Sequence, residues 1–328
     1  MKVIRGSGTW KKKKTPLGIA LGNFDGVHLG HQAILKNLIE TCKKNGWTSA
    51  VYTFDPHPTK ILAPKTAPLL IQTLEQKLEA LEIMGVETVI LEKFDHRFSK
   101  WGPRKFFDDI LVKRLKAKAL WTGYDFTFGF KRGGSVELLK SLCQKKGVPL
   151  YVTRAQFAKE TLVSSTQIRQ LIAQGKVRLV RDFLGRPFSL TGRVVKGMGL
   201  GGQMGIHTAN LEVENELLPK TGIYATRTRI GTTDHGPWTK DQKKKMEYPS
   251  ATSVGFNPTF PGKGFSVETH LIGFEGNLVG KKIEVAFLEW MRDELTFPNA
   301  ETLAMQIQKD IAEAKKINEA SRDYRQAG

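Results

Sequence analysis

Residues 16–36 are the segment that most constrains the fold of this chain. An apolar run over residues 16–21 leads into a turn rich in glycine, asparagine and aspartate, and apolar residues then recur at positions 34, 35, 38, 39 and 42. That spacing is typical of a helix, so the segment predicts a strand, a tight turn and a helix. Such units build parallel sheets that are covered by helices.

The turn has the composition of a phosphate-binding loop. Gly22, Gly26 and Gly30 lack side chains where the backbone can approach a ligand, and His28 and His31 lie at the expected start of the helix. Free backbone N–H groups and the helix dipole favour a polyphosphate at that point. This segment alone leaves capping, packing or metal binding by the two histidines open.

The first half of the chain alternates between two kinds of element. Strands are expected at residues 50–54, 86–91, 119–123 and 148–153, and helices at residues 74–84, 103–115 and 136–146. This order predicts an α/β fold in which a parallel, Rossmann-like sheet has helices on both faces. Ligands of such sheets bind at the carboxyl ends of the strands.

Three further motifs follow expected strands or begin a helix. Residues 54–58 read Phe-Asp-Pro-His-Pro, residues 123–129 read Gly-Tyr-Asp-Phe-Thr-Phe-Gly, and residues 163–169 read Val-Ser-Ser-Thr-Gln-Ile-Arg. Their structural interpretations are a proline-braced loop, a turn between core aromatic rings and a helix cap. They could also serve a ligand, because aromatic rings stack on heterocycles and a capped helix start with an arginine binds phosphate.

The second half changes character near residue 186. Short β-like runs separated by Gly, Pro and Asn predict a small antiparallel barrel, and residues 300–325 predict a terminal helix. We therefore expect two domains, residues 1–186 and 187–328. A glycine-rich stretch before Thr208 and Asn210 could wrap phosphates, and these two side chains have oxygen atoms that suit a hard cation. The charged residues 240–247 are expected to form a solvated hairpin.

The motifs of both halves, in this order, resemble those of the bacterial bifunctional riboflavin kinase/FAD synthetases. The first half is similar to the adenylyltransferase patterns Gly-Asn-Phe-Asp-Gly-Val-His-x-Gly-His, Phe-x-Pro-His-Pro, Gly-Tyr-Asp-Phe-x-Phe-Gly and Ser-Ser-Thr-x-Ile-Arg. In the second half, residues 192–210, 218–225, 253–260, 267–271 and 291–297 are similar to riboflavin kinase. The resemblance implies an enzyme that uses ATP to convert riboflavin to FMN and then FMN to FAD and pyrophosphate.

In the adenylyltransferase half, the resemblance implies catalytic roles for His28, His31 and Arg169. It implies ATP binding by Gly22, Asn23, Phe24, Gly30, Ser164, Ser165 and Thr166. It implies that the flavin side is lined by Phe54, Pro56, His57, Asp125 and Phe126. The FMN phosphate would attack the α-phosphorus of ATP, a step that needs mainly alignment and neutralisation of charge.

In the kinase half, the resemblance implies that Glu268 takes the proton from the terminal ribityl hydroxyl of riboflavin. It implies nucleotide and flavin contacts by Gly199, Gly205, Thr208, Asn210 and Arg292, with Mg²⁺ held by Thr208 and Asn210. The chain departs from the family pattern, which has arginine, phenylalanine, proline, aspartate and tyrosine, at Gly202, Ile206, His207, Gly273 and Val279. The alternative function is therefore an FMN adenylyltransferase with a degenerate kinase domain.

Composition and charge bear on the partners and the location. The formal net charge of +19 leaves a basic nucleic-acid-binding or regulatory protein open. No helix-turn-helix, zinc or aromatic RNA-binding signature accompanies that charge, so nucleic acid is not an expected partner. No apolar run of about 18 residues suggests a membrane span, and the basic start is a poor secretion signal, so we expect a cytoplasmic protein. Cys42 and Cys143 lack neighbouring cysteines and are expected to be reduced.

The sequence leaves two further matters open. Adenylyl or cytidylyl transfer to a non-flavin phosphate is a third possible reaction, although the aromatic residues around Asp125 favour a flavin. The partners expected are the small molecules riboflavin, FMN and ATP, and a weak homo-oligomer stays open.

Overall fold

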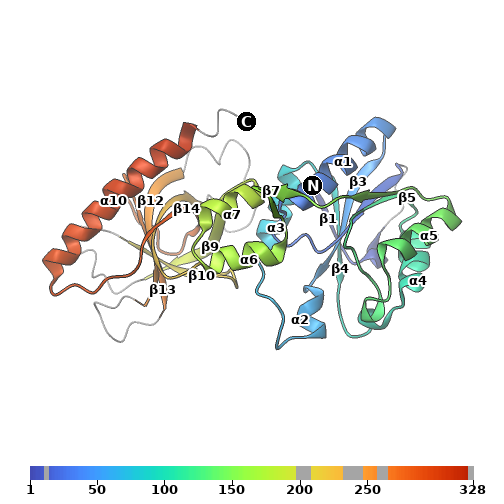
Figure 1. The fold of residues 1–328 in the computed structure, drawn as a ribbon, viewed down its shortest axis with the longest axis horizontal. Coiled ribbons are helices and arrows are strands. Elements are labelled where there is room, and N and C mark those ends of the chain that lie inside the picture. The colour runs from blue at the N-terminus through green and yellow to red at the C-terminus, as the bar shows by residue number, and fades with distance from the viewer. Residues whose placement is uncertain (11–14, 197–207, 232–246, 257–264, 324–328) are drawn as a thin grey trace. The chain divides into compact units, whose positions relative to one another are not determined.

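The computed structural model describes residues 1–10, 15–196, 208–231, 247–256 and 265–323 of the 328-residue chain. Contacts between Cα atoms divide the chain into two compact units, Met1–Ser165 and Thr166–Gly328 (Figure 1). The domain boundary expected near residue 186 stays a prediction, and the backbone contacts divide the chain earlier. None of the described helices is long and apolar enough to cross a membrane.

The N-terminal unit is built on a six-stranded sheet with the strand order β1-β4-β3-β2-β5-β6. All neighbouring strands are parallel, as expected. The strands are β1 (Lys2–Arg5), β2 (Leu17–Leu21), β3 (Thr48–Asp55), β4 (Thr88–Lys93), β5 (Ala117–Gly123) and β6 (Leu150–Thr153). Strand β1 is absent from the sequence-based expectations, because only one of its four side chains is buried and no hydrophobic alternation marks it.

Helices cover both faces of this sheet. Helices α1 (Leu29–Asn45) and α3 (Leu74–Ile83) pack on one face, where they bury strand residues such as Ala20 and Val51. The π-helix η3 (Phe106–Arg114) and α5 (Val136–Lys146) pack on the other face, against Ile19 and Tyr52. Because successive strand residues point to opposite faces, the two hydrophobic clusters confirm the predicted helix-covered sheet.

The remaining elements of this unit are short. The helix expected over residues 103–115 is divided into α4 (Pro103–Lys105) and the π-helix η3. The others are η1 (Ser7–Thr9), α2 (Pro58–Leu62), η2 (Phe98–Lys100), η4 (Phe130–Arg132), β7 (Phe157–Ala158) and β8 (Thr161–Leu162). Cys42 and Cys143 are free and buried in α1 and α5, and burial raises the pKa of each thiol to about 11.

The C-terminal unit contains the predicted antiparallel barrel. Its strands close in the order β10-β13-β12-β11-β14-β9, and each neighbouring pair is antiparallel. They are β9 (Phe188–Val195), β10 (Ala209–Val213), β11 (Gly222–Ile230), β12 (Glu247–Gly255), β13 (Ser266–Leu271) and β14 (Lys282–Arg292). Apart from Glu247, which begins β12, the hairpin expected over residues 240–247 lies outside the described residues.

Within the described residues, three helices accompany the barrel strands in sequence. Helix α6 (Ser165–Ala173) starts at the predicted helix cap, and the terminal helix α10 (Ala300–Asp323) packs on β11, β12 and β14 as expected. Helix α7 (Val177–Leu184) packs on β9 and β14 and is absent from the sequence-based expectations. It buries Val177, Val180 and Phe183, which makes it a short amphipathic helix.

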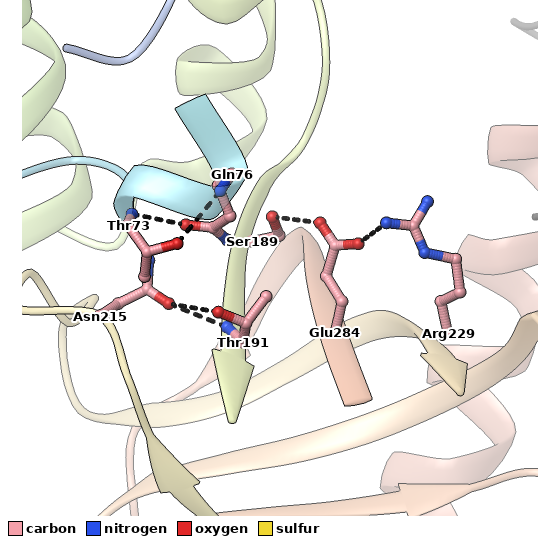
Figure 2. A network of polar contacts seen from close by, with 7 residues as sticks. All are labelled: Thr73, Gln76, Ser189, Thr191, Asn215, Arg229 and Glu284. Carbon is pink, nitrogen blue, oxygen red and sulfur yellow. Dashed lines mark hydrogen bonds and ion pairs between the residues drawn. The ribbon is translucent and has the colours of Figure 1, made fainter. Parts of the chain in front are cut away.

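Polar contacts hold neighbouring barrel strands together (Figure 2). Ser189 of β9 donates a hydrogen bond of 2.7 Å to Glu284 of β14, and Glu284 also forms an ion pair with Arg229 of β11. The backbone N–H of Thr191 donates to the Asn215 side chain at 2.8 Å, which fixes the chain after β10 against β9. These contacts satisfy polar groups that the closed barrel partly buries.

The barrel interior also contains a cluster of fully buried hydroxyl groups. They hydrogen-bond to one another over distances of 2.7, 2.8 and 3.3 Å. The cluster is made by Thr226, Thr228, Ser250, Thr252 and Thr269. Each hydroxyl can donate and accept, so the cluster satisfies itself without water.

Candidate active sites

The first candidate site lies at the carboxyl end of β2, where the chain turns into α1. All five residues of β2 are buried, and the turn over residues 22–27 follows directly, which confirms the predicted strand, turn and helix. Strand β2 has β3 on one side and β5 on the other, so the direction of the strand order reverses here. Open α/β sheets bind ligands at such a position.

His28 and His31 stack on each other at the start of α1. Their ring centroids are 3.7 Å apart and the ring planes differ by 18°. His28 is the N-cap residue, and its Nδ1 accepts the backbone N–H of His31 at 3.4 Å, which leaves the proton of neutral His28 on Nε2. The Nδ1 atom of His31 is buried and has no hydrogen-bond partner within the described part of the chain. A ligand is a natural partner for that atom, because buried polar atoms are rarely left unpaired.

The pKa of His31 explains its protonation state. Burial lowers this pKa well below the ordinary value of 6.5, and the charge of Lys77, together with that of His28 when its ring is protonated, lowers it further. His31 is therefore neutral at pH 7 and offers a hydrogen bond rather than a full charge. A bound polyphosphate would raise the pKa again, because a neighbouring negative charge favours the protonated ring.

The absence of a side chain at Gly30 makes room for the His28 ring. A Cβ atom at this position would lie 3.1 Å from Nδ1 and Cε1 of that ring, closer than such atoms normally approach. A larger residue would therefore push His28 away from His31. Glycine at this position is therefore explained by the neighbouring His28 ring, and it would also allow a ligand to approach the backbone.

The Phe-Asp-Pro-His-Pro motif at the end of β3 lies next to the turn, because β3 and β2 are neighbouring strands. Phe54 packs against Tyr52, Phe94 and Phe98, with ring centroids 5.5, 5.3 and 5.7 Å apart. Pro56 follows the strand, and the His57 Nδ1 accepts the backbone N–H of Thr59 at 3.3 Å to cap α2. These contacts agree with the structural interpretation of the motif, and its contact with flavin stays a prediction.

The aromatic motif after β5 lies on the other side of β2. Phe126 stacks on Phe128 with centroids 5.5 Å apart and planes at 14°. An added Cβ at Gly123 would lie 3.2 Å from the Asp125 carboxylate, so this carboxylate folds back over the end of β5. The structure thus places motifs that are far apart in the sequence after three adjacent strands, β3, β2 and β5.

The predicted phosphate-binding motif at residues 163–169 also reaches the turn. The Ser165 hydroxyl donates to the backbone carbonyl of Asp25 at 2.8 Å, across 140 positions of sequence. Ser164 directly precedes it. Thr166 and Arg169 lie in the other compact unit, so their predicted roles at this turn stay predictions.

Lys77 is a residue at this turn that the sequence analysis missed. Its ammonium group donates a hydrogen bond of 3.4 Å to the carbonyl of Asn23. In the sequence, Lys77 is one of many lysines on the polar side of an amphipathic helix, and nothing distinguishes it from a solvated one.

The second candidate site lies on β10 and β13 of the barrel. Asn210 pairs in register with Glu268, and the Thr208 hydroxyl donates to the Glu268 carboxylate at 3.5 Å. Ser266, which the sequence analysis missed, donates to the other carboxylate oxygen at 3.1 Å. The structure therefore brings together the three predicted kinase residues, on the strand face opposite the buried Val267 and Thr269.

Arg292 is the remaining predicted kinase residue within the described part of the chain, and its side chain binds another protein residue. Its guanidinium forms two hydrogen bonds with the Asp310 carboxylate, at 3.0 and 2.6 Å, and so ties the end of β14 to α10. A flavin contact by this residue stays a prediction. Gly273 has a φ of 77°, a conformation that favours glycine. Five predicted or divergent positions lie outside the described residues, namely Gly199, Gly202, Gly205, Ile206 and His207.

Models of two protein families match consecutive parts of the chain. One, described as FAD synthetase, matches residues 10–167, and the other, described as riboflavin kinase, matches residues 184–318. The fold and the two sites thus define a two-domain transferase in which a nucleotide-binding parallel sheet is joined to a kinase barrel.

Similar full-length proteins identify the family. The chain is 33% identical over 319 residues to the bifunctional riboflavin kinase/FMN adenylyltransferase of Buchnera aphidicola subsp. Schizaphis graminum, covering 96% of this chain and 98% of that one. It is 32% identical to the protein of that name from Haemophilus influenzae, covering 96% and 98%. The chain belongs to the family of bifunctional riboflavin kinase/FMN adenylyltransferases.

A solved structure supports the same fold for the whole chain. It is described as a macrolide-efflux protein from Streptococcus pneumoniae, has a TM-score of 0.82 and 26% sequence identity, and covers 96% of this chain and 99% of that one. The name of that protein describes efflux of macrolides, and this description applies to the Streptococcus pneumoniae protein.

Proposed function

We propose that this protein makes flavin cofactors in two steps and consumes ATP in both. The C-terminal unit phosphorylates riboflavin to FMN, and the N-terminal unit transfers an adenylyl group from ATP to FMN, giving FAD and pyrophosphate. Besides family membership, one observation supports this most. Each half brings its predicted reactive groups together, His28 with His31 and Glu268 with Thr208 and Asn210.

Adenylyl transfer needs little acid–base chemistry from the protein. An oxygen of the FMN phosphate, already ionised at pH 7, attacks the α-phosphorus of ATP, and the bond to the β-phosphate oxygen breaks to release pyrophosphate. The N-terminus of α1 and the His28 and His31 rings can donate hydrogen bonds to the phosphoryl oxygens as negative charge grows there. A fixed alignment of the two phosphates supplies the remaining rate enhancement.

Riboflavin phosphorylation needs a base, and we assign this role to Glu268. Its carboxylate accepts the proton of the terminal ribityl hydroxyl while that oxygen bonds to the γ-phosphorus of ATP and ADP leaves. Hydrogen bonds from Thr208 and Ser266 hold the carboxylate in one orientation.

The residues of the barrel site fit Mg²⁺, which remains part of the proposal. Thr208, Asn210 and Glu268 present a hydroxyl, an amide and a carboxylate oxygen, and hard cations prefer such ligands. The described residues contain no cluster of three or more histidine, cysteine or acidic side chains that could hold a metal. Few protein ligands are needed, because Mg²⁺ beside ATP also takes phosphate oxygens and water, and there it would neutralise phosphate charge.

The alternative function is adenylyl transfer alone, with a barrel that has lost kinase activity. The departures at Gly202 and His207 favour it, since they remove a positive charge and a backbone constraint near Thr208. We favour the active kinase, because Glu268, Thr208 and Asn210 are present and adjacent. A cytoplasmic location is also part of our proposal, and a weak homo-oligomer stays a prediction.

Incubation of the purified protein with riboflavin, ATP and Mg²⁺ tests the proposed function. We expect chromatography to show FMN first and FAD later. FAD formed from added FMN but not from riboflavin would favour the alternative function. No product from either flavin would refute both.

A further inference from the structure

Helix α3 is fixed at its start by a capping box (Figure 2). The backbone N–H of Thr73 donates to the Gln76 side chain at 2.9 Å, and the backbone N–H of Gln76 donates to the Thr73 hydroxyl at 3.2 Å. The backbone N–H of Lys77 donates in turn to the Thr73 carbonyl at 3.0 Å. The backbone from which the Lys77 side chain extends is therefore well fixed.

Two contacts attach this helix start to the turn after β2. The backbone N–H of Ile71 donates to the Asp25 carboxylate at 3.0 Å, and the Lys77 ammonium donates to the Asn23 carbonyl at 3.4 Å. The Lys77 charge also acts on the His31 ring. The ammonium group thus lies at the same turn as the two stacked histidines.

The Lys77 ammonium has few partners for a group of its kind. It has three N–H bonds, and its contact with Asn23 uses one of them. It forms no ion pair with any residue that the structure describes, and Asp25 and Asp55 attract it only from a longer range. Lys77 is half-buried, and partial removal of a cation from water without an ion pair costs free energy, which a bound anion would offset.

We propose that Lys77 binds a phosphoryl oxygen of the reacting nucleotides in the adenylyltransferase site. The inference rests on the proposed function of this site. Lysine suits the role, because its ammonium is a compact charge that binds phosphate from many directions. It would add a full positive charge where His28 and His31 offer hydrogen bonds. The oxygen comes either from the triphosphate of ATP or from the phosphate of FMN. The competing explanation is structural, in which Lys77 only compensates the negative charge of Asp25.

The test compares three variants of the full-length protein with wild type. Lys77→Met removes the charge and keeps the length of the side chain, Lys77→Arg keeps the charge, and Lys140→Met changes an exposed lysine on α5 of the same unit. For each protein we would measure kcat and KM for ATP and FMN in FAD synthesis from added FMN. Binding of inorganic pyrophosphate by calorimetry and the melting temperature complete the set. Riboflavin phosphorylation by the same preparations reports on the barrel.

We expect Lys77→Met to raise the KM of ATP or FMN by about tenfold or more, as the loss of a charge-assisted hydrogen bond implies. Lys77→Arg should stay within about threefold of wild type, and Lys140→Met should match it. Weaker pyrophosphate binding would identify ATP as the source of the oxygen. A raised KM for FMN with unchanged pyrophosphate binding would identify FMN.

Two outcomes would overturn the proposal. One is that both KM values and pyrophosphate binding stay within about twofold of wild type in Lys77→Met. The other is that Lys77→Met and Lys77→Arg lose binding and melting temperature together, which indicates a structural role. A wild-type protein that makes no FAD from FMN would refute the proposed function instead, and the pyrophosphate measurement would still test Lys77.

Discussion

His28 and His31 lie three residues apart, yet their ring nitrogen atoms have different tasks. The Nδ1 atom of His28 is used inside the protein, because it caps α1 by accepting the backbone N–H of His31. The Nδ1 atom of His31 is buried without a hydrogen-bond partner in the described chain, and its pKa is lowered by burial. His28 therefore shapes the helix start, whereas His31 depends more on a ligand for its partner.

Substitutions of one catalytic residue in each unit should separate the two reactions. We expect His31→Ala to slow FAD formation from FMN by about 100-fold or more, because it removes a donor to the transferring phosphoryl group. Riboflavin phosphorylation should be unchanged. Glu268→Gln should abolish FMN formation and spare the conversion of FMN to FAD, because the amide cannot accept the hydroxyl proton. Product chromatography measures both rates.

A control for these variants is the melting temperature of each protein, which should stay near that of wild type. If either substitution slowed both reactions equally in a folded protein, the assignment of one site to each unit would be wrong.

The lowered pKa of His31 also predicts a dependence of stability on pH. Below pH 6.5 the unfolded His31 binds a proton that the folded residue resists, so the free energy of unfolding should decrease as the pH falls through this value. The decrease is at most about 1.4 kcal/mol per pH unit for one such group. Hydrogen exchange of the α1 amides at pH values about one unit above and below 6.5 measures it. His31→Gln should reduce the slope, and an unchanged slope would assign it to another residue.

At the scale of elements, the terminal helix α10 is attached to the barrel through buried polar contacts. Asn318 is fully buried, donates to the Thr226 carbonyl at 2.9 Å and accepts from the Arg227 guanidinium at 3.1 Å. Arg292 and Asp310 form a second attachment near the end of β14. The helix is thus held by specific hydrogen bonds as well as by apolar packing.

Asn318→Ala should destabilise the C-terminal unit by about 2–3 kcal/mol. The substitution leaves a buried carbonyl and a buried guanidinium nitrogen without their partners, and unpaired buried groups are costly. Calorimetric unfolding measures the effect on this unit. Glu313→Ala, at an exposed position of the same helix, is the control and should stay within about 0.5 kcal/mol of wild type. Equal effects of the two substitutions would contradict this account of how α10 is attached.

At the scale of the whole molecule, the chain consists of two units with separate cores. The N-terminal unit buries hydrophobic clusters on both faces of its sheet, and the C-terminal unit buries rings such as Phe188, Tyr224 and Phe287 inside its barrel. The described groups proposed for riboflavin phosphorylation all lie in the second unit, and the stacked histidines lie in the first. The proposed function therefore assigns the stacked histidines and the Glu268 group to different units.

This division predicts that two defective proteins can complement each other. A mixture of His31→Ala and Glu268→Gln should convert riboflavin to FAD, because FMN made by the first protein can diffuse to the second. Chromatography of the mixture and of each variant alone measures this. Accumulation of FMN without FAD in the mixture would instead indicate that FMN must pass between sites within one chain.

The sequence by itself determined the features of the fold that depend on residues close together in the chain. The strand, turn and helix around His28 and the alternation of strands and helices follow from hydrophobic spacing and turn residues. These signals act over a few residues, so they can be read from the chain. The β-rich second half indicated a barrel for the same reason. The resemblance to a known family named Thr208, Asn210 and Glu268, and the structure showed that they are adjacent.

Only the tertiary structure decided which distant groups meet. The structure shows β1 at the edge of the sheet, a hydrogen bond from the Ser165 hydroxyl to the Asp25 carbonyl, and one from the Lys77 ammonium to the Asn23 carbonyl. None of these contacts has a local signal, because a short edge strand, a serine and a surface-like lysine occur in many settings. Their places are set by the packing of helices on the sheet, which acts between residues far apart in the chain.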